Sequence, residues 1–301
     1  MMIKQNKPEV SVVIPTRNRA KMLQRALESV IYQTFENWEA VVVDDDSEDN
    51  TVEVVARFND PRIRLVNFKS NGVIAACRNH SIRVSRGLII AFLDSDDCWY
   101  PKKLERCLEA MTAEVDLVAH GLVYKKNGRI LRKRLSGPAK RASYKQLLYT
   151  GNCLATSAVM VRKKCLERAS GFFEDPVHVV AEDYDLWLRL AKNRTRFAFV
   201  NEMLGEYYFH SGNVNKDPWC FIKAQLAVIE RHFADIGDKS LIEWIRRQRR
   251  RALVFYTAAR GLQDDRMKTE ALRLYCRSAL IFPFAFKIYV AMILTICGWS
   301  H

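Results

Sequence analysis

The sequence predicts an α/β fold, with a mixed β-sheet between helices on both faces and a helical C-terminal region. In the first third of the chain, short β-branched runs alternate with segments of helical periodicity, which is the pattern of a parallel sheet covered by helices. The predicted strands are almost continuously apolar, as strands buried on both faces are. Beyond about residue 219 nearly every segment has helical periodicity.

Strands and helices alternate from the N-terminus. We predict strands at 10–14, 40–43, 63–66 and 88–93 and helices at 20–32, 51–58 and 73–85. After Pro101 the order becomes mixed: a helix to about 113, strands at 117–119 and 157–161, and a helix at 182–191. This change in order predicts that the second half of the sheet is not purely parallel.

The composition indicates a globular protein with an anionic partner. The chain has 301 residues, is 49% hydrophobic and carries a formal net charge of +14, so the candidates are nucleic acid, a membrane or a phosphorylated substrate. Nine bases and no acid lie between Lys125 and Lys145, and eleven bases against four acids lie between Leu241 and His301. Nucleic acid is disfavoured, because acidic clusters repel phosphate and no aromatic-basic module is present.

The cysteines and the N-terminus predict a cytoplasmic protein. The eight cysteines form no Cys-x-x-Cys pair, and unpaired cysteines of this kind are typical of a reducing compartment. The first residues, Met-Met-Ile-Lys-Gln-Asn-Lys-Pro, contain no apolar segment of the kind found in signal peptides.

Polar residues follow the predicted strands at their carboxyl ends. Thr16–Asn18 follows the first strand, Asp44–Asp46 the second and Asp94–Asp97 the fourth. Ligands of open α/β sheets bind at this edge. Mg²⁺ needs only one or two protein carboxylates when it also binds phosphates, so the acids predict a divalent-cation site for Mn²⁺ or Mg²⁺. Alternatively, the same acids cap turns and helix starts. No Gly-x-Gly-x-x-Gly follows the first strand, which disfavours a dinucleotide cofactor.

Five motifs in sequence order resemble family 2 glycosyltransferases of the GT-A fold. They are Val10–Arg19, Val41–Ser47, Asn71–Asn79, Ala91–Asp97 with Pro101, and Glu182-Asp183 with Trp187. The resemblance implies a Rossmann-like GT-A catalytic domain at 1–218, with a nucleotide-sugar half at 8–100 and an acceptor half at 101–218. The region 219–301 is then a helical, basic and membrane-associated extension.

The resemblance also implies an activity. A family member of this kind is an enzyme that transfers a sugar from a nucleotide-diphospho-sugar, here expected to be a UDP-sugar, to a hydroxyl of a glycan or lipid-linked glycan. Transfer proceeds with inversion and needs a divalent metal, and surface polysaccharide biosynthesis is the expected setting. The alternatives are a metal-dependent nucleotidyltransferase and a non-catalytic glycosyltransferase-like binding protein.

The resemblance assigns the donor side of the site. It places Thr16, Asn18, Asp45, Arg78, Asp94 and Asp96 at the nucleotide-sugar, and Asp96, Asp97 and His210 at the metal. Within this set Thr16 and Asp45 meet the nucleobase, and Asp94 and Asp96 contact ribose and metal. Two assignments stay open: Asn79 packs its helix if Arg78 alone reaches the nucleotide, and His210 either binds the metal or touches the diphosphate.

The resemblance places the catalytic base at Asp183. Inversion needs one carboxylate that takes the proton of the acceptor hydroxyl, and Glu182 is the alternative base. An acid at a helix N-terminus is also favoured by the helix dipole alone. Glu182 and Trp187 mark a possible acceptor pocket, although Trp187 could instead pack its helix.

Two basic segments are candidates for contact with anions. The stretch 125–145 is expected to touch a phosphate-bearing acceptor or the membrane, or else to be a solvated hairpin around Asn127-Gly128. The twelve apolar residues Ile288–Trp299 are too short to span a bilayer, so we expect a helix on the membrane surface, with a true span or a core helix as alternatives. Arg246–Arg251 would suit anionic headgroups or form a solvated helix face. The predicted location is the inner face of the plasma membrane.

Overall fold

The computed structural model of the chain describes residues 7–210 and 217–298. The strands are β1 (Val10–Thr16), β2 (Trp38–Asp44), β3 (Ile63–Asn67), β4 (Ile89–Phe92), β5 (Cys98–Trp99), β6 (Leu117–Lys126), β7 (Arg129–Arg134), β8 (Val159–Arg162) and β9 (Phe197–Phe209). The helices of the catalytic part are α1 (Ala20–Ile31), α2 (Thr51–Arg57), α3 (Ile74–Val84), α4 (Lys103–Ala110), α5 (Tyr144–Thr150), α6 (Lys163–Arg168) and α7 (Glu182–Lys192). They are followed by α8 (Pro218–Ala234), α9 (Leu241–Asp264), α10 (Lys268–Ile281) and α11 (Phe286–Ile296).

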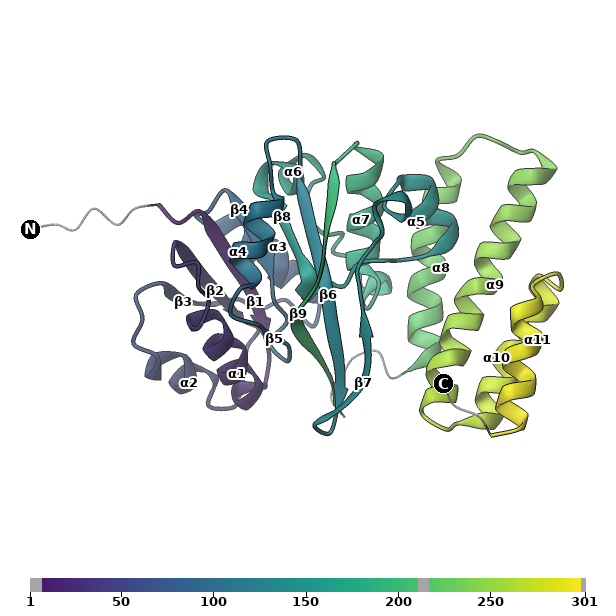
Figure 1. Cartoon of the computed structure of the whole chain (residues 1–301), viewed down its shortest axis with the longest axis horizontal. Helices are drawn as coiled ribbons and strands as arrows, with labels where there is room; N and C mark the ends of the chain where they lie inside the picture. The colour runs from purple at the N-terminus through teal and green to yellow at the C-terminus, as the bar shows by residue number, and fades with distance from the viewer. Residues whose placement is uncertain (1–6, 211–216, 299–301) are drawn as a thin grey trace, which may run out of the picture.

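One nine-stranded sheet forms the centre of the molecule (Figure 1). Its order is β3-β2-β1-β4-β8-β6-β9-β5, and β7 pairs with β6 outside this path. The first four strands of this order pair in parallel, whereas β8 is antiparallel to both β4 and β6. The sheet is therefore mixed, and the change occurs after residue 101 as the sequence predicts.

Helices cover both faces of the parallel half. Alternate residues of a strand point to opposite faces, so Val12 and Ile14 share a hydrophobic cluster with Leu23 of α1, while Val13 shares another with Ile82 of α3. Both faces of β1 and β2 are buried along their whole length. The polar loops at the carboxyl ends of these strands are consequently held by rigid elements.

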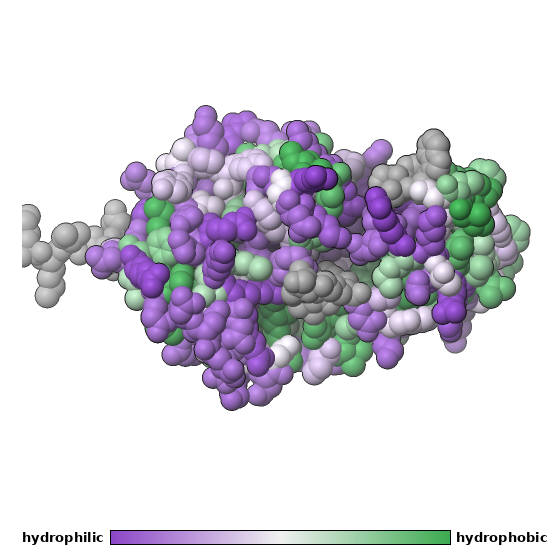
Figure 2. Space-filling view, turned by 90° about the horizontal axis from the view of Figure 1, so that it is seen from below, coloured by the Kyte–Doolittle hydropathy of each residue, from purple (hydrophilic) through white to green (hydrophobic). Residues whose placement is uncertain are grey.

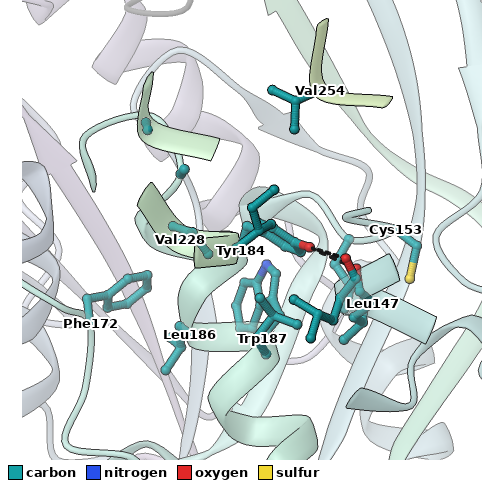
Figure 3. Close-up of a cluster of buried hydrophobic side chains, with 14 of the residues drawn as sticks. Leu147, Cys153, Phe172, Tyr184, Leu186, Trp187, Val228 and Val254 are labelled. Carbon is teal, nitrogen blue, oxygen red and sulfur yellow. Dashed lines mark hydrogen bonds between the residues drawn. The ribbon is translucent and has the colours of Figure 1, made fainter. Parts of the chain in front are cut away.

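The hydrophobic core continues from α7 into the C-terminal helices. Figure 3 shows Val228 of α8 beside Tyr184 of α7, and Leu186 of α7 and Val254 of α9 belong to the same buried cluster. The Tyr184 hydroxyl donates a hydrogen bond to the carbonyl of Leu147, 2.8 Å away. The C-terminal helical region therefore shares its core with the part of the chain that forms the sheet.

Most arginines of the run 246–251 form hydrogen bonds or ion pairs within the protein. Arg250 is 3% exposed and donates to the carbonyl of Leu148 at 2.9 Å. Arg247 pairs with Glu243 at 3.0 Å, and Arg251 pairs with Glu230 at 2.6 Å. Arg246 and Arg249 are exposed. The whole run therefore does not form a single surface for headgroups or solvent, because Arg250 faces the core and Arg247 and Arg251 pair with acids.

The last apolar segment forms a short helix that lies against α9 and α10. Ile288 and Ala291 are buried in the core, whereas Phe286, Ile293 and Ile296 are 79%, 60% and 66% exposed. Trp299, the end of the predicted apolar run, lies outside the described residues. None of the helices in the two described ranges is long and apolar enough to cross a bilayer.

The basic stretch after residue 125 begins as a β-hairpin. Asn127 and Gly128 have φ of 49° and 77°, the left-handed values that a two-residue hairpin turn requires. The following strand β7 is exposed at all six positions. The structure therefore contains the hairpin that the Asn-Gly pair predicts.

Candidate active site

The nucleobase residues predicted from the sequence lie side by side at the ends of β1 and β2. The backbone N–H of Asp45 donates to the carbonyl of Thr16 at 2.9 Å, and both side chains are buried. The Asp45 carboxylate accepts from the backbone N–H and the hydroxyl of Ser70, each at 2.6 Å. Thr16 Oγ1 is buried and has no hydrogen-bond partner in the described parts of the chain. The hydrogen-bonding capacity of this hydroxyl is therefore unused by the described residues.

Asn18 fastens the loop after β1 to the loop after β2. Its φ is 51°, a left-handed conformation that Asn tolerates better than most residues. Its backbone N–H donates to Ser47 Oγ at 2.9 Å, and its Oδ1 accepts from the N–H of Glu48 at 2.7 Å. The amide of Asn18 thus positions the acidic loop in this structure.

Asp96 and Asp97 point in different directions. Asp96 Oδ2 lies 2.9 Å from both Arg19 Nη1 and His210 Nε2. Asp97 accepts hydrogen bonds from Ser157 Oγ at 2.5 Å and from the N–H of Tyr208 at 3.2 Å. Burial, together with the negative charges of Asp96 and Asp94, raises the pKa of Asp97 well above its usual value.

These contacts distinguish Asp96 and His210 from Asp97 as candidate metal ligands. Asp96 and His210 lie together, one carboxylate and one imidazole, which suits a borderline-hard cation such as Mn²⁺. Asp97 is instead occupied by Ser157 and Tyr208. Three or more His, Cys, Asp or Glu side chains nowhere form a complete cation cage within the residues that the structure describes. A cation bound here would therefore need oxygen ligands from the substrate as well.

Arg78 joins the donor side of the site to the base side. Its guanidinium is 3% exposed and donates to Asp94 Oδ1 at 2.6 Å and to Glu182 Oε1 at 2.5 Å. Although burial acts in the opposite direction, these carboxylates raise the pKa of Arg78, which keeps it charged. Arg78 is thus committed to two protein carboxylates. Its neighbour Asn79 packs the helix, because its side chain pairs with the backbone of Phe172.

Asp183 begins α7 and has the properties of a general base. Its side chain is partly accessible, and Oδ2 accepts from Thr156 Oγ1 at 3.1 Å. Burial and the negative charge of Glu182 raise the pKa of Asp183 to about 7, against the lowering effect of Arg78. A general base is most effective when its pKa lies near the working pH, because a large fraction is then ionised and it is still basic enough to take a proton.

Glu182 and Trp187 face the interior. Glu182 is 6% exposed, and its Oε1 is paired with Arg78. Trp187 is fully buried and packs against Phe92 with ring centroids 6.2 Å apart; Figure 3 shows it beside Tyr184 and Leu186. Trp187 therefore packs its helix, which is one of the two roles expected for it.

Residues 11–169 match the family model for Glycosyl transferase family 2. The chain belongs to this family.

Two curated glycosyltransferases illustrate the similarity in sequence. One is the UDP-Glc:alpha-D-GlcNAc-diphosphoundecaprenol beta-1,3-glucosyltransferase WfgD of Escherichia coli, 30% identical over 221 residues, covering 73% of this chain and 85% of that protein. The other is the putative teichuronic acid biosynthesis glycosyltransferase TuaG of Bacillus subtilis, 29% identical over 218 residues, covering 71% and 84%. With the family match, these relatives establish that the protein is a glycosyltransferase.

Solved structures show the same fold. S. aureus TarS, residues 1–349 in complex with UDP, superposes with a TM-score of 0.60 at 18% identity, covering 96% of this chain and 87% of that chain. The mannosyltransferase PcManGT from Pyrobaculum calidifontis, in complex with GDP-Man and Mn²⁺, gives a TM-score of 0.59 at 17% identity, covering 97% and 85%. The GT-A fold predicted from the motifs is confirmed.

The glycosyltransferase site also contains residues that the sequence did not single out. Ser157 holds Asp97, Thr156 holds Asp183, and Ser70 holds Asp45. Each of these partners lies 25 or more residues from the acid it binds. Arg19, which contacts Asp96, belongs to the first motif and was the one such residue with a sequence signal.

Proposed function

We propose that this glycosyltransferase transfers a sugar from a UDP-sugar to a hydroxyl of a lipid-diphosphate-linked glycan with inversion, in surface polysaccharide synthesis. The observation that carries the proposal is the linkage Asp94–Arg78–Glu182, which joins the donor loop to the residue next to Asp183, the proposed base. The names of the Escherichia coli and Bacillus subtilis relatives support the donor and the acceptor class. Residues 8–100 then form the donor half and 101–218 the acceptor half.

With a single usable base, we expect one direct displacement at the anomeric carbon and therefore inversion. Asp183 takes the proton of the acceptor hydroxyl while that oxygen attacks the anomeric carbon opposite the departing diphosphate. Thr156 fixes the carboxylate of Asp183 through its hydrogen bond. Glu182 cannot turn to the acceptor without breaking its buried ion pair with Arg78, which is costly. A single displacement of this kind inverts the configuration of the anomeric carbon.

The donor nucleotide fits the loops after β1 and β2. The Asp45 carboxylate is suited to accept a hydrogen bond from a uracil N–H, and the buried Thr16 hydroxyl is suited to a second polar atom of the base. Asn18 holds the loops that carry these side chains. Asp94 is the candidate for the ribose hydroxyls.

Asp96 and His210 fit a divalent metal, Mn²⁺ or Mg²⁺. When bound, the ion neutralises the negative charge that develops on the leaving diphosphate. The charges around it support this assignment, since the acids at 94, 96 and 97 repel one another and a cation relieves that repulsion. Arg19 supplies a further positive charge at Asp96.

The C-terminal helices are the proposed contact with the inner face of the plasma membrane. Figure 2 shows hydrophobic surface gathered at the end of the molecule formed by α9–α11. Leu280, Phe284 and Phe286 are at least 79% exposed there. The exposed bases of α9 and the net charge of +14 would attract the anionic lipids of the cytoplasmic leaflet. Contact with this surface would bring the site to a lipid-linked acceptor.

A panel of UDP-sugars tests the proposal. In the presence of Mn²⁺ and without acceptor, we expect slow hydrolysis of one UDP-sugar and a rise in Tm with UDP. Removal of the metal with EDTA should abolish both effects. If no nucleoside diphosphate stabilises the protein, the donor site is assigned wrongly. Stabilisation without metal would remove the cation from the proposal but leave the nucleotide.

A further inference from the structure

The basic arm, defined here as residues 125–145, carries charge that the protein does not neutralise. Lys125 and Lys126 pair with Glu206 and Asp265. The other seven bases of the arm form no ion pair with any residue that the structure describes. Unpaired bases are ordinary on a surface, so their position relative to the active site decides whether they have a function.

The sheet register places two of these basic residues on the same sheet face as Tyr124 and Tyr207. Arg132 lies opposite Tyr124, and Arg134 lies opposite Leu122. On the other side of β6, Tyr124 lies next to Tyr207. Directly paired residues share a face of a sheet, so Arg132, Tyr124 and Tyr207 form one row. Lys133 pairs with Val123 and points to the opposite face.

This face contains a small recess beside the hairpin. Leu122, Tyr124 and Arg134 line it on the hairpin side, and residues 153–155 line it on the other. The next residue, Thr156, is the one that donates to Asp183. The lining of the recess therefore ends one residue before the threonine that holds Asp183.

Tyr124 lies within electrostatic range of both the basic arm and the acids of the site. Burial raises the pKa of Tyr124, the positive charges of Arg134 and Arg132 lower it, and the negative charges of Asp97 and Asp183 raise it. The guanidinium of Arg132 lies 4.9 Å from the centre of the Tyr124 ring. Tyr124 thus has arginines of the arm on one side and carboxylates of the site on the other.

Aromatic side chains form the floor between these charges. The rings of Tyr124 and Tyr207 are 5.1 Å apart, and Phe209 lies 5.1 Å from Tyr207. Neither tyrosine hydroxyl has a hydrogen-bond partner among the described residues. An aromatic floor with free hydroxyls suits a sugar ring, which has both apolar C–H faces and polar edges.

We infer that this face of the hairpin binds the acceptor through its diphosphate, with Arg134 and Arg132 on the diphosphate oxygens and the acceptor sugar over Tyr124 and Tyr207, pointing to Asp183. Arginine pairs with such oxygens through two parallel hydrogen bonds. The inference rests on the proposed function and adds the residues that select a diphosphate-linked acceptor. A purely electrostatic membrane contact would instead use Lys133 as much as Arg134, because it depends on charge and not on the face of the strand.

Binding of octyl diphosphate to the UDP-saturated enzyme tests the inference. UDP fills the donor site, so calorimetry then reports the second diphosphate site alone. We expect saturable binding that weakens about tenfold in Arg134→Ala and in Arg132→Ala, the loss of one charge-assisted pair. Lys133→Ala, the matched variant on the opposite face, should bind as the wild type does. Octyl glucoside, which has the chain but no charge, should not compete.

Each result has one meaning. Absence of saturable binding to the UDP-filled enzyme, or equal weakening in the Arg134 and Lys133 variants, overturns the inference. Equal loss of binding to anionic vesicles by all three variants, with octyl diphosphate binding unchanged, would assign the arm to the membrane. Failure of the wild type to bind UDP contradicts the proposed function itself, which separates the two failures. All three substituted residues are exposed on β7, and circular dichroism confirms folding.

Discussion

Thr156 Oγ1 lies 3.1 Å from Asp183 Oδ2 and donates a hydrogen bond to it. The pKa of Asp183 results from opposed influences: burial and Glu182 raise it to about 7, whereas Arg78, the backbone N–H of Tyr184 and Thr156 lower it. A base acts only when ionised, so transfer should fall as the pH drops below about 7. Substitution of each neighbour should therefore shift the pKa of Asp183 in a defined direction.

Thr156→Val should move the acidic limb of the pH–rate profile to higher pH. The variant loses the hydrogen bond that favours ionised Asp183, worth about 1.5 kcal/mol, or roughly one pH unit. At pH 7 we expect kcat to fall several-fold, with recovery at pH 9. Thr156→Ser keeps the hydroxyl and is the control. A parallel loss at every pH would show that Thr156 does not act through the ionisation of Asp183.

Glu182→Gln should move the same limb in the opposite direction. Removal of the Glu182 charge leaves Arg78 as the nearest charge to Asp183, so its pKa falls and activity persists to lower pH. Measurement of kcat/KM between pH 5 and 9 distinguishes this from the alternative role of Glu182. Complete inactivity across that range, in a folded variant that binds UDP, would make Glu182 the base.

Asp183→Asn should abolish transfer, keep UDP binding and raise Tm at alkaline pH. The pKa of Asp183 is raised on folding, so its contribution to stability is complete below the usual value of 3.8 and is lost as the pH rises to about 7. The Tm of the variant should therefore exceed that of the wild type by a few degrees at pH 8 and by less at pH 5. A constant difference in Tm would place the ionisation elsewhere.

Asp96→Asn and His210→Ala should each lose the metal-dependent part of UDP binding. A ligand at 100 times its Kd stabilises a protein by about 2.7 kcal/mol, and this gain in the presence of Mn²⁺ should shrink in both variants. Glu53→Gln removes an exposed acid of α2 and serves as the control. Full retention of the Mn²⁺ effect in both variants would exclude Asp96 and His210 as ligands.

The double variant Phe286→Ser with Ile293→Ser should bind anionic vesicles about tenfold more weakly. Both side chains are mostly exposed on α11, and their loss removes apolar area that would enter the lipid interface. Vesicle sedimentation at low and high salt measures the effect. Val52→Ser, a 49% exposed residue of α2, is the control. Equal sedimentation of both proteins would show that α11 does not contact lipid.

The sequence predicted the parts of the fold that depend on local patterns. The β-branched runs around Val12, Val42 and Ile90 and the helical spacing after Ala20 specify the parallel half of the sheet. The long strand β9 was not predicted, because its residues are mostly half-buried and do not alternate cleanly. Its position follows from pairing with β6, which lies about eighty residues earlier.

The acids of the site were predictable, and their partners were not. Asp45, Asp96 and Asp183 follow strand ends or begin a helix within recognisable motifs. Ser157 and Thr156 are common residues in an ordinary loop, and only folding brings them to Asp97 and Asp183. Arg78 was expected at the nucleotide, yet two carboxylates from distant segments hold it. A sequence gives the charge of a side chain but not which opposite charge will reach it.

Arg250 has a consequence for engineering and for the exchange of segments between relatives. Its guanidinium, on α9, donates to the carbonyl of Leu148 at the end of α5 and lies 3.3 Å from the hydroxyl of Tyr184 on α7. A chimaera that took the C-terminal helices from another member would bury those two oxygens without their donor. Recombination in this enzyme must therefore carry α5, α7 and α9 together, and the helix that carries Asp183, the proposed base, is inherited with the C-terminal region.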